Sequence, residues 1–170
     1  MKSNQSKSDQ FKSLYKNHKD KIYRLCYGYL HDKAEIDDLF QQVLLNIWEN
    51  IESFRGEAQL STWVYRVTVN TAIMYSKKHR KLRDVERPEV DFSLASDQEP
   101  EEPDSDPLPA LRVLHECIHK LEKQDRIIIS LYLEDLSYAE IAKVVGISVN
   151  YVGVKINRIK NELQQLMPEQ

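Results

Sequence analysis

The chain has 170 residues and a net charge of −3, with only four glycines and six prolines. This length suits one medium-sized domain or two small ones, and the dominant helical periodicity predicts an all-α protein. No apolar run approaches the ~18 residues that a membrane helix requires, so no membrane insertion is expected. The N-terminus has no apolar signal-peptide core, and Cys26 and Cys117 stand in unrelated contexts, which is typical of reduced, buried thiols in a cytoplasmic protein.

The charge is divided unevenly along the chain. Residues 1–87 hold 16 Lys/Arg against 11 Asp/Glu, a net charge of +5. Residues 88–110 hold 8 Asp/Glu and no Lys/Arg, and residues 111–170 hold 8 of each. One short acidic segment therefore masks a basic N-terminal half in the overall balance.

The first helical domain is expected over residues 11–83, after a polar and disordered N-terminus at 1–10. Its first amphipathic segment carries apolar residues at helical spacing: Phe11, Leu14, Tyr15, Ile22, Leu25, Cys26 and Tyr29. A second helix has an apolar stripe from Ile36 to Ile51, and a loop is expected at Arg55-Gly56-Glu57. A third helix is expected to begin at Ser61 or Thr62. It ends in a basic stretch, residues 77–83, with five Lys/Arg and no acid, which favours contact with phosphates.

A flexible linker is predicted over residues 84–109. It contains five of the six prolines and the acidic run. Proline lacks an amide donor and like charges repel, so this segment cannot build a packed core. The fold class is therefore two small helical domains joined by a flexible acidic linker.

The second domain, residues 110–170, contains a predicted helix-turn-helix between Leu136 and Leu163. Ser137 and Glu140 match a capping box, Gly146 suits the turn, and Ser148 can cap the second helix. Ile141, Ala142 and Val145 are expected on the buried side of the first helix. The buried stripe of the second helix is expected to contain Val152, Ile156, Ile159, Leu163 and Leu166.

A plain helical hairpin in a small bundle would show many of the same signals. Tyr151 and Val154 favour DNA recognition, because exposed apolar groups can meet thymine methyls while Asn and Arg reach base edges and phosphates. Two segments together resemble the bacterial sigma factors of the extracytoplasmic-function group. They are residues 34–81, with Phe54-Arg55-Gly56, Leu60-Ser61-Thr62-Trp63 and Asn70, and the hairpin with its preceding helix.

The resemblance implies a non-enzymatic initiation subunit, without cofactors, that binds core RNA polymerase and promoter DNA. Anti-sigma proteins are common partners in this group. The polymerase would be bound by Asp38, Leu39, Gln41, Gln42 and Leu45. The minus-ten element, read as a melted strand, would be bound by Arg55, Ser61, Arg66, Asn70, Lys77, Lys78 and Arg80. The minus-thirty-five element, read as duplex, would be bound by Asn150, Tyr151, Val154, Lys155, Asn157, Arg158 and Lys160.

The sequence also departs from the family pattern. Gln42 stands where an acid is usual, as does Met74, and the helix around Gly153 carries fewer cations than is common. The promoter sequence therefore cannot be taken from a relative. The resemblance also implies that the acidic linker threads the RNA exit path of the polymerase, while a solubilising spacer is an equal interpretation.

Two alternatives from other classes stay open at this point. A free-standing helix-turn-helix activator would use its N-terminal half to sense or to dimerise. A zinc hydrolase is suggested by His115, Glu116 and His119, which match the H-E-x-x-H pattern. Leu111, Leu114, Ile118 and Leu121 are expected to form the buried stripe of that helix, with Glu116 and His119 toward solvent. No metal site is therefore expected.

Overall fold

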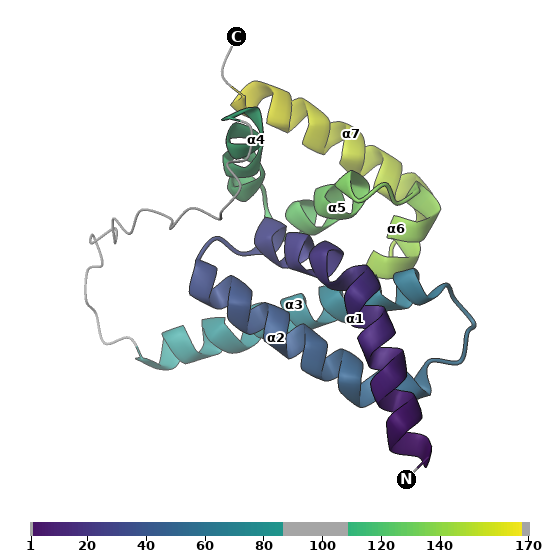
Figure 1. Cartoon of the computed structure of the whole chain (residues 1–170). Coiled ribbons are helices and arrows are strands. Elements are labelled where there is room, and N and C mark those ends of the chain that lie inside the picture. The colour runs from purple at the N-terminus through teal and green to yellow at the C-terminus, as the bar shows by residue number, and fades with distance from the viewer. Residues whose placement is uncertain (1, 87–108, 168–170) are drawn as a thin grey trace.

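The computed structural model describes the backbone of residues 2–86 and 109–167. All regular secondary structure in these residues is helical. Within these two ranges, seven α-helices and one short 3-10 helix follow one another (Figure 1). They are α1 (Lys2–Tyr29), α2 (Lys33–Asn50), η1 (Ile51–Ser53), α3 (Leu60–Glu86), α4 (Pro109–Lys120), α5 (Lys123–Leu133), α6 (Tyr138–Val145) and α7 (Val149–Leu166). The predicted all-α class is confirmed. Most of the predicted linker lies outside the described residues.

The first half packs α1, α2 and α3 around a common apolar core. Ile22, Leu39 and Val64 are fully buried where the three helices meet. Phe11 and Trp48 meet edge to face with ring centroids 5.3 Å apart, the preferred geometry of an aromatic pair. Helix α1 begins at Lys2, so residues 2–10, which were expected to be disordered, are helical. The residues there are all polar, so no apolar stripe in the sequence could indicate this.

The second half contains the helix-turn-helix with the caps that the sequence indicates. The Ser137 side chain accepts from the backbone of Glu140, whose carboxylate accepts from the Ser137 backbone, so both members of the capping box are present. Gly146 ends α6 with φ 79°, a left-handed conformation that favours glycine. The Ser148 side chain accepts from the Tyr151 backbone at the start of α7.

The buried stripes of the second half differ in detail from the predicted ones. In α6 Val144 is buried and Val145 only half-buried. In α4 Leu111 is 53% exposed, because the first turn extends beyond the neighbouring helices, and Cys117 is buried instead. Both cysteines are buried free thiols, as expected. No helix within residues 2–86 and 109–167 is long and apolar enough to cross a membrane.

The two halves pack directly against each other, which the sequence did not indicate. One continuous apolar core includes Ile22 and Leu25 of α1 together with Ile128 and Leu131 of α5. The close approach of the two helices depends on Gly28, since a Cβ there would lie 2.4 Å from the Ser130 hydroxyl oxygen.

Three polar contacts add to this interface. Arg24 of α1 forms a bidentate pair with Glu134, in which one nitrogen lies 2.9 Å from the carboxylate. Arg66 of α3 donates to the Lys143 carbonyl of α6 at 3.0 Å. Arg126 of α5 donates to the Tyr29 carbonyl at the end of α1, also at 3.0 Å. In Figure 1, α5 and α6 accordingly lie directly over the first half.

Replacing Gly28 by alanine should loosen the contact between the halves, because the Ser130 hydroxyl must move away from the new methyl group and overpacking costs about 1–3 kcal/mol. The radius of gyration measured by small-angle X-ray scattering should increase. The double variant Gly28→Ala/Ser130→Ala should restore the compact value. Gly153→Ala is the matched control, since its Cβ would meet Tyr138 at an ordinary 3.6 Å. An unchanged radius in Gly28→Ala would contradict this interpretation of the interface.

Candidate nucleic-acid interface

Helix α7 presents an exposed face of mixed polar and apolar side chains. Tyr151 is 43% exposed and Val154 is 53% exposed, although both could have packed in a small bundle. Val149 in the first turn is similarly exposed, and sequence reasoning did not include it. The Ser148 cap fixes the start of the helix, so these side chains emerge at its N-terminal end. This is the end that reads base edges when such a helix enters the major groove.

Most of the predicted minus-thirty-five residues lie on this exposed face. Those exposed to solvent are Asn150, Tyr151, Val154, Asn157, Arg158 and Lys160. Lys160 donates to the Tyr132 hydroxyl at 2.9 Å and its ammonium lies 4.5 Å from the centre of that ring. The contact with Tyr132 therefore fixes the Lys160 ammonium at the edge of the exposed face of α7.

Lys155 does not lie on the exposed face. It is 7% exposed, and its ammonium donates to the Asp125 carboxylate of α5 at 2.8 Å. That hydrogen bond raises the pKa of Lys155, so the lysine stays charged within the domain. Its expected role in contacting DNA does not match this placement. Helical spacing puts it beside Val152 and Ile156, and the long stem reaches an acid on another helix.

Helix α3 and the loop before it carry the predicted minus-ten residues. Exposed positions along this surface are Arg55, Arg66, Asn70, Lys77, Lys78 and Arg80, and Ser61 is half-buried. Trp63 is half-buried against the core with its ring 5.6 Å from that of Phe54, so it packs inward rather than toward solvent. Arg66 already donates to the Lys143 carbonyl. The surface therefore begins beside the interface between the halves and ends in the basic stretch.

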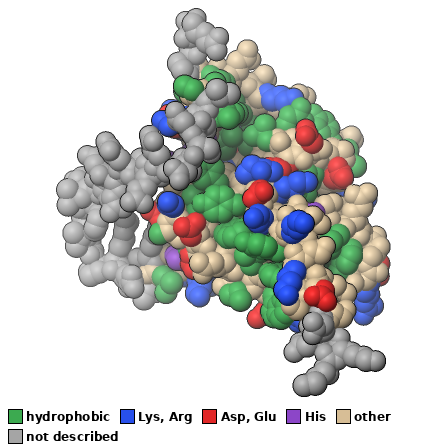
Figure 2. Space-filling view, in the orientation of Figure 1, with side chains coloured by type: hydrophobic (Ala, Val, Ile, Leu, Met, Phe, Trp, Pro, Cys, Tyr) green, Lys and Arg blue, Asp and Glu red, His purple; other side chains and the backbone are tan. Residues whose placement is uncertain are grey.

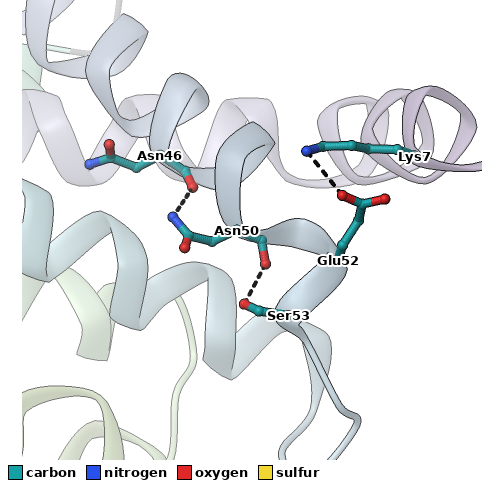
Figure 3. Close-up of polar contacts among 5 residues, drawn as sticks. All are labelled: Lys7, Asn46, Asn50, Glu52 and Ser53. Atoms are coloured by element: carbon teal, nitrogen blue, oxygen red, sulfur yellow. Dashed lines mark hydrogen bonds and ion pairs between the residues drawn. The ribbon is translucent and has the colours of Figure 1, made fainter. Parts of the chain in front are cut away.

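The end of α2 positions the loop that leads to α3 (Figure 3). Asn50 donates from its side chain to the Asn46 carbonyl at 2.8 Å, and Ser53 donates to the Asn50 carbonyl at 2.6 Å. The Ser53 bond satisfies a carbonyl that the end of α2 leaves without a helical partner, and the Asn50 bond holds that side chain against the last turn. Lys7 of α1 lies 3.2 Å from the Glu52 carboxylate and ties η1 to the first helix. The loop therefore leaves from a fixed point.

Only some of the residues predicted to bind polymerase on α2 are exposed to solvent. Gln41, Gln42 and Leu45 are exposed, and Leu45 is 55% exposed. Asp38 is also exposed, and its carboxylate accepts from the Tyr75 hydroxyl at 2.9 Å. Leu39 is fully buried in the core and cannot contact a partner in this arrangement. The prediction for Leu39 was wrong because it belongs to the apolar stripe with Ile36 and Val43.

Lys and Arg side chains also follow the course of α1 across the face shown in Figure 2, interspersed with acids. The positive charge of the first half is thus spread over its surface rather than confined to α3. A spread of this kind favours attraction of an anionic polymer before specific contacts form.

The two histidines of the H-E-x-x-H pattern lie at the interface between the halves. Their Nε2 atoms are 3.0 Å apart, and they lie 3.1 Å (His115) and 3.2 Å (His119) from the Tyr27 carbonyl of α1. His119 is therefore half-buried, not toward solvent as expected, because α1 covers that side of α4. No group of three His, Cys, Asp or Glu among the described residues is arranged to hold a metal ion. The two histidines therefore take part in the contact between α4 and α1.

Burial lowers the pKa of His119 to about 4, with smaller contributions from His115, His31 and Arg126. Burial also lowers the pKa of His115, while the Tyr27 carbonyl and Glu116 act in the opposite direction. In the separated state both rings would titrate near the ordinary value, about 6.5. The packed arrangement therefore binds fewer protons. The two neutral rings therefore stabilise the packed state fully above the separated-state pKa of about 6.5. This stabilisation is lost as the pH falls from there toward the lowered pKa values of the packed state.

The halves should accordingly separate or loosen as the pH falls from 7.5 to 5.5. The radius of gyration should rise over this range, and the variant His115→Gln/His119→Gln should show much less change. Arg126 and His31 face the pair from α5 and from the turn after α1, and both are retained in the variant, so any response that depends on them alone is common to the two proteins. An equal pH response in the variant would contradict the assignment to this pair.

Comparison with known proteins places the chain in a family. Residues 14–82 match Sigma-70 region 2, and residues 111–163 match Sigma-70 region 4. The chain is 31% identical over 182 residues to the ECF RNA polymerase sigma-E factor of Haemophilus influenzae, covering 92% of this chain and 89% of that protein. It is 28% identical over 159 residues to the RNA polymerase sigma factor SigV of Bacillus subtilis, covering 93% of this chain and 91% of SigV.

Solved structures agree in fold. The sigma factor RpoE of Bartonella quintana, in a co-crystal with the anti-sigma factor NepR, matches with a TM-score of 0.69 at 20% identity, covering 92% of this chain and 95% of that one. CnrH, in complex with the cytosolic domain of CnrY, matches with a TM-score of 0.63 at 19% identity, covering 92% of this chain and 86% of that one. The two matched regions define a sigma factor, and the chain belongs to the extracytoplasmic-function group of that family. Its general role is therefore promoter-specific transcription initiation.

Proposed function

We propose that the chain binds core RNA polymerase in the cytoplasm and reads two promoter elements, one with each half. The exposed face of α7 carries this proposal. Tyr151 and Val154 expose apolar groups between Asn150, Asn157 and Arg158 on the helix that follows a capped, glycine-terminated turn. An apolar contact to a thymine methyl and hydrogen bonds to base edges can share such a face. We assign it to duplex DNA of the minus-thirty-five element.

The first half is proposed to bind the minus-ten element as a melted strand. A single strand requires cations along its backbone and polar or aromatic groups at its bases. The proposed contacts are Arg55, Ser61, Arg66, Asn70, Lys77, Lys78 and Arg80. Their support is the continuous exposed surface of α3, which runs from the loop after η1 to the basic stretch.

The proposal requires the two halves to separate on the promoter. Arg66 is held by the Lys143 carbonyl, and α6 packs against α3 beside it. Two elements spaced along a duplex cannot both be reached from one compact body about 40 Å across or less. Binding of the polymerase to Asp38, Gln41, Gln42 and Leu45 is proposed to supply the free energy of opening.

RpoE of Bartonella quintana, which has a similar fold, is solved with the anti-sigma factor NepR, and we propose a partner of that class here. The subunit itself contributes no catalytic group, since the polymerase supplies the chemistry. The alternative of a free-standing activator differs in one requirement, because it would bind its site without polymerase.

Reconstitution with core polymerase on a promoter library, followed by transcript-start mapping, tests the function. Starts should cluster downstream of one shared pair of sequence elements, and core polymerase alone should not produce them. Tight, specific binding of the isolated protein as a symmetric dimer, with no change in transcript starts, would favour the activator and reject the sigma-factor assignment.

Variants of α7 test how the duplex element is read. Val154→Ala should cost about 1–3 kcal/mol at one base pair and relax the preference there, as expected for a base contact. Arg158→Ala should weaken initiation at all promoters more evenly. The salt dependence of promoter binding should fall by about the amount expected for one lost phosphate contact. Gln165→Ala, exposed near the end of the same helix, is the matched control. Unchanged promoter preference in Val154→Ala would contradict the assigned face.

A further inference from the structure

A cavity of about 460 Å³ opens where the end of α1, the start of α2, the middle of α3 and the start of α5 meet. Cavities of this size are within the range that binds small molecules, about 300–1,000 Å³. Both halves of the chain contribute to its wall. The lining residues are Tyr29, Leu30, His31, Glu35, Tyr75, Ser76, His79, Arg80, Lys123 and Arg126.

The wall of this cavity is predominantly cationic. Arg80 of α3 and Lys123 and Arg126 of α5 carry permanent charges, and Glu35 is the one carboxylate among the described lining residues. Burial lowers the pKa of Arg126, whose guanidinium is partly removed from water and has the Tyr29 carbonyl and the His119 ring as neutral polar neighbours. The site therefore favours an anion over a neutral or cationic ligand.

Two hydrogen-bond donors in the wall have no partner. Arg126 Nε and the Ser76 hydroxyl oxygen are buried atoms without a hydrogen bond, one from each half of the chain. An unsatisfied buried polar atom costs about 1–3 kcal/mol, so such atoms are uncommon unless something binds them. A group with several acceptor oxygens would satisfy both.

Aromatic rings line the same cavity beside these donors. Tyr75 and His79 stack with ring centroids 4.1 Å apart and 27° between their planes. Tyr29 and His31 also contribute to the wall. Flat aromatic surfaces next to cations suit a ligand that combines a base with phosphates.

We propose that this cavity binds a small phosphate-bearing ligand of the nucleoside-phosphate class. Its phosphate oxygens would accept from Arg126 Nε and the Ser76 hydroxyl once small side-chain rotations turn these buried donors toward the cavity, with Arg80 and Lys123 neutralising the charge. Its base would lie against the Tyr75–His79 pair. Because the two halves each supply part of the wall, the ligand binds only the packed arrangement and stabilises it by mass action.

Isothermal titration calorimetry with ADP, inorganic pyrophosphate and adenosine on the full chain tests this site. ADP should bind most tightly, pyrophosphate more weakly and adenosine least. Ser76→Ala should weaken ADP binding about 3- to 10-fold through one lost hydrogen bond, without loss of thermal stability, because the hydroxyl has no partner in the free protein. Lys123→Gln should weaken it to a similar extent and reduce its salt dependence.

Lys120→Gln is the matched control, since Lys120 is exposed and lies outside the cavity wall. The proposal is overturned if neither ADP nor pyrophosphate binds at millimolar concentration, or if Ser76→Ala and Lys120→Gln bind ADP as the unchanged protein does. Binding of single-stranded oligonucleotides alone would also overturn it and assign the cations to DNA. These outcomes are independent of transcription, so they do not bear on the role as a sigma factor.

Discussion

The carboxyl end of α1 is the point on which the arrangement of the two halves depends. The last carbonyls of a helix have no partner within it and must be satisfied from elsewhere. Here the second half supplies the partners: His115 and His119 lie against the Tyr27 carbonyl, and Arg126 donates to that of Tyr29. The negative end of the helix dipole also favours cations at this place. Gly28 then allows the backbone to approach α5 closely enough for these contacts to form.

This one junction positions three other features of the molecule. It sets α5 and α6 against the first half, which brings Lys143 to Arg66. It places Arg126 and Lys123 opposite Ser76 and Arg80, forming the cationic cavity. It also leaves the exposed face of α7 pointing outward while the start of the α3 surface is held at the interface. Separation of the halves would expose these carbonyls to water. The packed state disfavours protonation of His115 and His119, so the junction stabilises the compact state best when both histidines are neutral.

Local features of the fold could be predicted from the sequence, and long-range ones could not. The capping box at Ser137 and the left-handed Gly146 depend on residues within one turn, so the pattern determines them. Lys155 was misplaced because helical spacing alone does not tell how wide a buried stripe becomes. Leu39 was misplaced because the family resemblance assigned it to a partner although its spacing with Ile36 and Val43 puts it in the core. The partner of Lys155 is Asp125, thirty residues away on another helix, which no spacing rule identifies. The exposed residues of α7 were predicted well because the apolar stripe opposite them is regular.

The central claim is that one chain carries two promoter-reading surfaces that are packed together when free and apart on the promoter. Spin labels at Glu49→Cys in α2 and Glu162→Cys in α7, both exposed, report the separation directly. The Cys26 thiol interferes little, because burial raises its pKa to about 12 and leaves it unreactive. Double electron–electron resonance should give one narrow distance distribution for the free chain and a clearly shifted one in the complex with core polymerase and promoter DNA. The same distribution in the free chain and in a transcribing complex would contradict the account.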